Sequence, residues 1–128
     1  MKNKLLRGIF FNPQKNELKV KVFSNTLDEI YRLINCDYIT TAVRRIGGHR
    51  VVIVCDDEGL LKPDNDVAIV TIGDSTNDVV EQIVGNVLIV GEGDEDFVSL
   101  TEEEIEDVLD ASKIATYDNR KILIAHCD

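Results

Sequence analysis

Residues 35–59 read N-C-D-Y-I-T-T-A-V-R-R-I-G-G-H-R-V-V-I-V-C-D-D-E-G, and this stretch decides the fold. Gly47-Gly48 separates two runs rich in β-branched residues. This predicts a hairpin with a two-residue loop, because such loops need positive φ angles at the central positions. The expected strands run roughly from Tyr38 to Ile46 and from His49 to Cys55, and the acidic turn Asp56-Asp57-Glu58-Gly59 ends the second strand.

The loop fixes a register in which Arg45 lies directly opposite Arg50. Like charges in opposed positions repel each other, so we expect an anionic group between or beside these two side chains. Guanidinium groups bind phosphate or carboxylate through paired N–H donors, and a Gly-Gly tip would let a ligand approach the backbone closely. We therefore take four residues as candidate ligand-binding residues: Arg44, Arg45, His49 and Arg50. The same register pairs Ile46 with His49, Arg44 with Val51, and Val43 with Val52.

Two interpretations of this basic tip stay open. The arginines can form salt bridges with the protein's own carboxylates, within one chain or between subunits, or they can bind a phosphate-bearing small molecule. Residues 1–53 carry ten Lys and Arg against four acids, a net charge of +6, whereas residues 54–128 carry four against twenty, a net charge of −16. The two halves therefore either pack against each other or form two functional faces. The overall net charge of −10 argues against binding to duplex nucleic acid.

The composition indicates one domain, residues 1–128, in which 44% of the residues are hydrophobic and 30% are charged. No apolar run approaches the ~20 residues needed to cross a bilayer. The N-terminus lacks a small-residue cleavage site, so we expect neither a membrane segment nor a signal peptide. The three cysteines form an odd set without C-x-x-C spacing, which indicates reduced thiols and a cytoplasmic location.

Further strands are expected where short apolar runs are bounded by turn residues. These are Leu5–Phe11, Glu17–Phe23, Val67–Ile72, Val87–Val90 and Lys121–Ala125. In the second of them apolar residues alternate with lysines. The alternation predicts one buried face, formed by Leu18, Val20 and Val22, and one solvated face, formed by Lys19 and Lys21.

Two helices are expected to begin at capping boxes, in which a threonine and a glutamate three residues later satisfy each other's backbone N–H groups. The boxes are Thr26 with Glu29, and Thr101 with Glu104. A short helical turn is expected at Asn77–Gln82. Strands that adjoin strands, interrupted by helices, predict an α+β fold with a mainly antiparallel or mixed sheet, a central β-hairpin and two or three helices.

The sequence gives little support for a catalytic or a metal-binding motif. Carboxylates cluster in the acidic turn, and Asp64 and Asp66 follow it. They do not form an EF-hand loop, because the next alternate position, where a ligand is needed, is Ala68. Cys55 and His49 are six residues apart on one expected strand, about 20 Å at full extension, which excludes direct contact between them. The sequence therefore assigns no catalytic, metal-binding or cofactor-binding residue.

Several short motifs carry a resemblance to a known family. They are Asn35-Cys36-Asp37, Arg45-Ile46-Gly47-Gly48, C-D-D-E-G-L from Cys55 to Leu60, Asn65, and Ile83-Val84-Gly85-Asn86. From roughly Leu18 to Asp110 the chain resembles a domain-of-unknown-function family of phages, plasmids and conjugative elements, with R-x-G-G…D-D-E-G as its most specific part. The resemblance implies an accessory role in a bacterial mobile element and no established activity. Small proteins of such elements often interfere with host defence, by binding a nucleotide signal, mimicking DNA charge or capping a host enzyme.

We therefore expect a non-enzymatic accessory binding protein, a homo-oligomer in the cytoplasm. Its basic hairpin tip would bind a phosphate-bearing small ligand or an acidic protein surface. One alternative is an acidic inhibitor or nucleic-acid mimic that binds a host protein through the carboxylates of residues 91–110. A second alternative is an enzyme that uses Asp56, Asp57 or Glu58.

Overall fold

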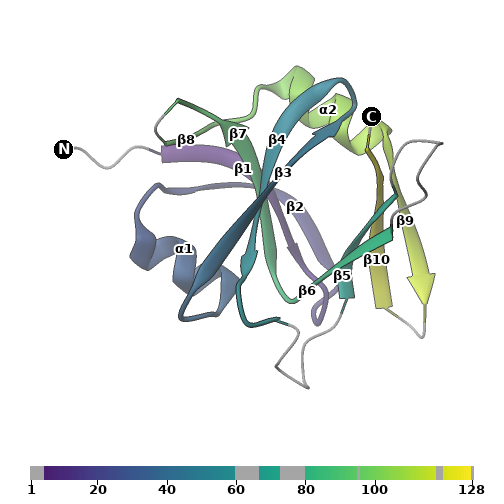
Figure 1. Ribbon diagram of the computed structural model, residues 1–128, viewed down its shortest axis with the longest axis horizontal. Coiled ribbons are helices and arrows are strands. Elements are labelled where there is room, and N and C mark those ends of the chain that lie inside the picture. Colours follow the sequence, from purple (N-terminus) through teal and green to yellow (C-terminus); the bar gives the residue numbers. More distant parts are fainter. Residues whose placement is uncertain (1–4, 60–66, 73–79, 95, 118–119, 128) are drawn as a thin grey trace.

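The computed structural model describes residues 5–59, 67–72, 80–94, 96–117 and 120–127. Within these ranges the chain forms ten strands and two helices (Figure 1). The strands are arranged in two β-sheets, and one helix packs against each of two apolar cores. The protein is therefore α+β and mostly sheet, with antiparallel and mixed pairing as expected.

The first sheet, called sheet A, contains the hairpin. Five of its strands lie in the order β2 (Glu17–Ser24), β1 (Leu5–Asn12), β7 (Val87–Glu92), β4 (His49–Asp56) and β3 (Ile39–Ile46), and β8 (Phe97–Val98) pairs with β7. All of these pairs are antiparallel. β7 therefore separates two hairpins that precede it in the chain, β1–β2 and β3–β4.

The second sheet, called sheet B, comes from the second half of the chain and lies on the right in Figure 1. Its strands lie in the order β6 (Val80–Val84), β5 (Val67–Ile72), β10 (Arg120–His126) and β9 (Ser112–Tyr117). β5 and β10 are parallel and the other two pairs are antiparallel, so this sheet is mixed.

Both helices begin at the predicted threonine N-caps. At α1 (Leu27–Ile34) the Thr26 hydroxyl accepts a hydrogen bond from the N–H of Glu29 at 3.2 Å. The predicted capping box is only half formed there, because the N–H of Thr26 donates to the Ser24 carbonyl at 2.9 Å. At α2 (Glu102–Asp110) the capping box is complete, because Thr101 Oγ1 and the Glu104 carboxylate each accept from the other residue's N–H, at 3.1 and 2.8 Å. Within the described ranges no helix is long and apolar enough to cross a membrane.

Alternation of side chains along sheet A supplies two separate cores. On one face, called the inner face, Val51 and Ile53 pack with residues of sheet B and α2. On the opposite, outer face, Val52 and Val54 pack with residues of α1. β7 is buried on both faces over the predicted apolar run Val87–Val90. Sheet A is thus the middle layer of the molecule.

The β3–β4 hairpin has the predicted two-residue loop. Gly47 and Gly48 have φ angles of 62° and 83°, as a type I′ turn requires. Arg45 pairs with Arg50, and all eight residues of β3 pair with β4 without a register shift. The register matches the predicted one at every pair.

The predicted burial of β2 is wrong. Val20 and Val22 are 47% and 53% exposed. Val20 pairs with Ile9 and therefore lies on the inner face. From β2, however, the core on the inner face includes only Leu18. β2 is the edge strand of sheet A, so its apolar face has little to pack against.

The helical turn expected at Asn77–Gln82 is wrong from Val80 onward. Residues 80–84 form β6, paired with β5, and their β-branched side chains favour a strand. Residues 77–79 lie outside the described ranges. The strands β8 and β9 were not predicted. None of the three cysteines is in a disulfide bond.

Candidate functional site

The four candidate residues of the hairpin tip lie on opposite faces of sheet A. Because side chains alternate along a strand, Arg45 and Arg50 share the outer face with Val52, whereas Arg44 and His49 share the inner face with core residues. The hairpin therefore brings Arg45 and Arg50 together, as predicted. It does not gather all four side chains into one site.

Arg50 is paired with Glu92, which lies beside it on β7. Its Nε and Nη2 atoms donate to the two carboxylate oxygens at 2.8 and 3.3 Å. The hydrogen bond, followed by the charge attraction, raises the pKa of Arg50. The same hydrogen bond is the main cause that lowers the pKa of Glu92. The anionic neighbour expected beside the arginines is thus, at least for Arg50, a carboxylate of the protein itself.

His49 contacts α2. Its Nε2–H donates to Asp107 Oδ2 at 2.7 Å, and its Nδ1 atom lies 4.0 Å from a carboxylate oxygen of Glu104. The hydrogen bond to Asp107 is the largest cause that raises the pKa of His49 above its ordinary value of 6.5, and the nearby carboxylate charges add to it. His49 therefore joins the hairpin to α2.

The glycine loop is also covered by α2. A Cβ atom on Gly47 would lie 2.4 Å from the backbone oxygen of Asp107, whereas one on Gly48 would meet no atom within 4 Å. The expectation that the Gly-Gly tip admits a ligand to the backbone is therefore wrong at Gly47. The helix occupies that position.

These contacts account for part of the charge segregation along the chain. Arg50–Glu92, His49–Asp107 and the 3.7 Å contact between Arg7 and Glu102 each join a base of the first half to an acid of the second. Arg44 Nη1 donates to the Val43 carbonyl at 2.8 Å, and both Arg44 and Arg45 make further interactions within the protein. The basic residues of the hairpin tip thus interact with other groups of the protein itself.

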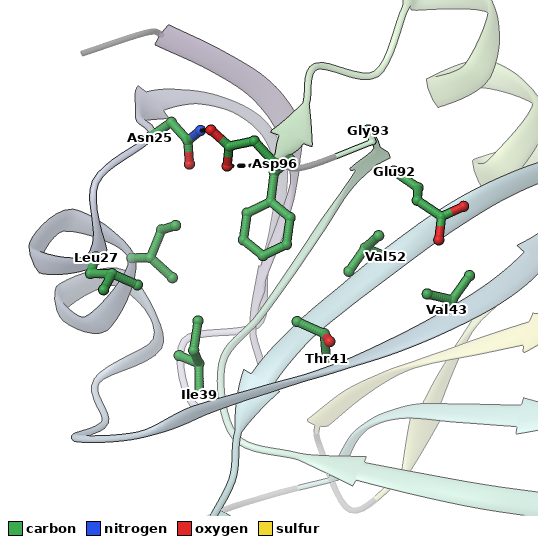
Figure 2. A pocket seen from close by; sticks show the side chains of 11 residues that line it. Asn25, Leu27, Ile39, Thr41, Val43, Val52, Glu92, Gly93 and Asp96 are labelled. Carbon is green, nitrogen blue, oxygen red and sulfur yellow. Dashed lines mark hydrogen bonds between the residues drawn. The ribbon is translucent and has the colours of Figure 1, made fainter. Parts of the chain in front are cut away.

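A groove lies on the outer face beside this hairpin (Figure 2). Its volume is about 440 Å³, within the usual range for small-ligand sites. β3 and β4 supply its floor, α1 supplies one wall, and the β7–β8 segment supplies the other. The lining side chains are mostly apolar, and they include Leu27, Ile39, Val43, Val52 and Phe97.

A hydrogen bond fastens the two walls of the groove together. Asn25, which precedes α1, donates from Nδ2 to Asp96 Oδ2 at 3.0 Å, as the dashed line in Figure 2 shows. The other carboxylate oxygen of Asp96 accepts from the N–H of Phe97 at 2.8 Å. These polar contacts therefore join the α1 wall of the groove to its β7–β8 wall.

Glu92 connects this groove to the arginine pair. It is a lining residue of the groove and, at the same time, the partner of Arg50. Val43 and Val52, which pair across β3 and β4, lie in the groove, and the next outward pair toward the hairpin tip is Arg45 with Arg50. One end of the apolar groove thus meets the Arg50–Glu92 pair, and Arg45 lies opposite Arg50 in the strand register.

A second cleft, of about 600 Å³, lies between β3 and β6 and includes the acidic turn. Asp56 is buried, and its Oδ1 atom accepts from the N–H of Glu58 at 2.9 Å, which shapes the turn. Among the described residues no three His, Cys, Asp or Glu side chains gather as a metal site; Asp64 and Asp66 lie outside those residues. Cys55 is buried and belongs to the lining of this cleft.

The acidic segment 91–110 is partly used for internal contacts. Glu92, Asp96, Glu104 and Asp107 have the partners given above. The exposed carboxylates on α2 are those of Glu102, which contacts Arg7, and of Glu103, Glu106 and Asp110.

Sequence reasoning did not find the groove. Leu27, the first residue of α1, is 58% exposed and lines the groove. The signal available for Phe97 was an isolated aromatic residue directly after an acidic, glycine-rich loop. Asn25 carried no signal, because its partner Asp96 is 71 residues away.

A family model described as "Domain of unknown function (DUF3846)" matches residues 6–113. No curated protein and no solved structure matches the chain. The matched range begins in β1 and ends in β9, so it includes the hairpin, the acidic turn and the whole outer-face groove.

Proposed function

Because the chain belongs to the DUF3846 family, whose description assigns no function, we propose a function from the geometry of the site. The protein is a non-enzymatic binding protein, and its ligand is a small anion with an apolar body. The apolar body lies in the outer-face groove, and the anionic group, a phosphate, sulfonate or carboxylate, lies toward Arg45 and Arg50. The setting that the family resemblance implies, an accessory protein of a bacterial mobile element, is part of this proposal.

The observation that carries the proposal is the position of the Arg50–Glu92 pair at the end of an apolar groove. A guanidinium group has five N–H donors, and Glu92 accepts from two atoms of Arg50. The side chain of Arg50 is 61% exposed, so its remaining donors can reach a ligand oxygen. An uncharged ligand would leave those donors to water, whereas an anion gains charge-assisted hydrogen bonds.

A pair of fluorescent probes tests this arrangement. Anilinonaphthalenesulfonate combines an aromatic body with an anionic group, and phenylnaphthylamine has a similar aromatic body without the charge. We expect both to bind the wild-type protein. Arg50→Gln should lower the affinity for the sulfonate probe about tenfold or more, since a hydrogen bond to a charged group contributes about 1.5–3 kcal/mol. The same variant should leave the affinity for the neutral probe almost unchanged.

Two tryptophan variants locate the bound probe. Val43→Trp fills the groove and should reduce binding of both probes. Val22→Trp is the matched control, because Val22 is an exposed valine on β2 and lies on the opposite face of sheet A. Equal effects of the two tryptophans, or equal effects of Arg50→Gln on both probes, would contradict the proposal.

The exposed carboxylates on α2 favour a second candidate, an inhibitor that presents acidic groups to a host nucleic-acid-binding protein. Glu103 and Glu106 are exposed on this helix, and such a contact would weaken as salt screens it. The test is displacement of DNA from a basic host protein at low and at high salt, with Glu103→Gln/Glu106→Gln as the variant. Displacement that does not change with salt or with this variant argues against it.

A further inference from the structure

The outer-face groove has an acidic lining. Among the described residues that line it, the two with charged side chains are Glu92 and Asp96 (Figure 2). The two oxygens of Asp96 accept from Asn25 and from the N–H of Phe97, so this carboxylate joins the walls. Glu92 instead contacts Arg50 at the end of the groove. A ligand whose charged group reaches Arg50 therefore lies beside a carboxylate as well.

The Arg50–Glu92 pair is a dipole, with a positive and a negative group side by side. The Glu92 carboxylate is ionised in this pair, because the hydrogen bond from Arg50 lowers its pKa. A simple anion placed against Arg50 is attracted by the guanidinium group and repelled by the carboxylate, whose oxygen lies 2.8 Å from Nε. A ligand with two opposite charges is attracted at both places, when its anion faces Arg50 and its cation faces Glu92.

Both partners keep hydrogen-bonding capacity for such a ligand. A guanidinium group has five N–H donors and a carboxylate has about four acceptor positions. The contact between Arg50 and Glu92 consists of two hydrogen bonds. The two side chains are 61% and 34% exposed, so each of them is accessible to a ligand.

We propose that the ligand of this groove is an α-amino acid with a large apolar side chain. Its carboxylate binds Arg50, its ammonium group binds Glu92, and its side chain lies in the groove against Val43 and Val52. This inference rests on the proposed function and narrows it, because the anionic group becomes the carboxylate of a zwitterion.

The spacing of the charges favours an α-amino acid over a peptide. Standard bond lengths and angles place the nitrogen and the carboxyl carbon of an α-amino acid about 2.5 Å apart. The charged groups of Arg50 and Glu92 are also adjacent, with 2.8 Å between Nε and the nearer carboxylate oxygen. Each further residue of an extended peptide separates its terminal charges by about 3.3–3.6 Å more, so both termini cannot meet this pair equally well.

The position of the apolar floor favours a long side chain. The floor begins at Val43 and Val52, one outward pair beyond Arg45 and Arg50. Two residues of a strand cover about 7 Å, so an indole or phenyl group reaches this floor and the methyl group of alanine does not. With a volume of about 440 Å³, the groove does not restrict the ligand to small side chains.

A set of indole compounds tests the ligand class. The protein contains no tryptophan, so the fluorescence of an indole ligand reports its binding to the full chain directly. Indole-3-propionate is tryptophan without the ammonium group, and tryptamine is tryptophan without the carboxylate. Tryptophan should bind about tenfold or more tightly than either analogue, because each analogue loses a hydrogen bond between charged groups. The dipeptide tryptophylglycine, whose charges lie further apart, should also bind more weakly than tryptophan.

Variants of the acid show whether Glu92 recognises the ammonium group. Glu92→Gln should lower the affinity for tryptophan about tenfold or more, and it should not lower the affinity for indole-3-propionate, which has no cation. Glu92→Asp keeps the charge and should restore part of the affinity for tryptophan. Glu102→Gln is the matched control, because it removes the acid of another exposed arginine–glutamate contact, with Arg7, and Glu102 does not line the groove. It should leave both affinities unchanged.

Several results would overturn the amino-acid ligand. They are equal affinities for tryptophan and either analogue, an equal effect of Glu92→Gln on tryptophan and indole-3-propionate, and no binding of tryptophan by a chain that binds the sulfonate probe. Equal binding of tryptophylglycine would overturn it in favour of a peptide terminus. The proposed function fails in a different measurement, when Arg50→Gln affects the charged and the neutral fluorescent probe equally.

Discussion

Replacing Gly47 by alanine tests the contact between the hairpin tip and α2. Gly47 has a φ of 62°, and an alanine in that left-handed conformation costs about 1 kcal/mol. In addition, its Cβ atom would lie 2.4 Å from the Asp107 oxygen and 2.7 Å from the Asp107 carbonyl carbon. Both atoms belong to the backbone of a helix, so the tip or the helix must shift, and overpacking of this kind costs about 1–3 kcal/mol. We expect a total loss of about 2–4 kcal/mol.

Gly48→Ala is the matched control. Gly48 also has a positive φ, of 83°, but an added Cβ atom would meet nothing within 4 Å. Only the conformational cost of about 1 kcal/mol remains. Equilibrium unfolding in urea, at one protein concentration, measures both free energies. Equal losses for the two variants would refute the packing of the tip against α2, since strain alone would then explain both.

Three further predictions concern other contacts. Thr101→Ala should destabilise by about 1 kcal/mol through loss of the helix N-cap, whereas Thr101→Ser should retain the cap; equal urea midpoints would contradict this. Because the pKa of His49 is raised in the folded state, its contribution is complete below pH 6.5 and is lost as the pH rises through the raised pKa. The stability difference between wild type and His49→Gln should therefore shrink from acidic to alkaline buffer, and a constant difference would argue against the Asp107 contact. Ile53→Ala should cost about 2–5 kcal/mol, because Ile53 is fully buried between the sheets, whereas Val20→Ala at the exposed edge should cost about 0.5 kcal/mol or less; comparable losses would contradict the assigned core.

Local patterns were sufficient for the elements whose structure depends on neighbouring residues. The Gly47-Gly48 loop sets the register of β3 and β4 because a two-residue turn leaves one way to pair the flanking residues. The threonine caps of both helices were predictable for the same reason, since each threonine hydroxyl accepts from an N–H that is three residues away. The buried run of β7 was indicated by the lack of any polar residue from Val87 to Val90.

The candidate site was less predictable, because it depends on contacts between distant segments. The pairing of Arg50 with Glu92 follows from the register of β4 against β7, and no turn connects these two strands. Alternation in β2 correctly groups Val20 with Val22, but it does not tell which face of the sheet will be covered. The groove has the same origin, since its walls come from α1 and from the β7–β8 segment.

The place of β7 in sheet A has a consequence for how the chain is made. The hairpins β1–β2 and β3–β4 have no direct strand pairing with each other and are joined only when β7 enters between them. A ribosome has to synthesise residues 87–92 before this happens. Until then the edges of β1 and β4 that will pair with β7 are unpaired, and nascent chains with such edges are prone to aggregate. A translational pause upstream of Val87 should therefore lower the yield of native protein more than a pause after Glu92.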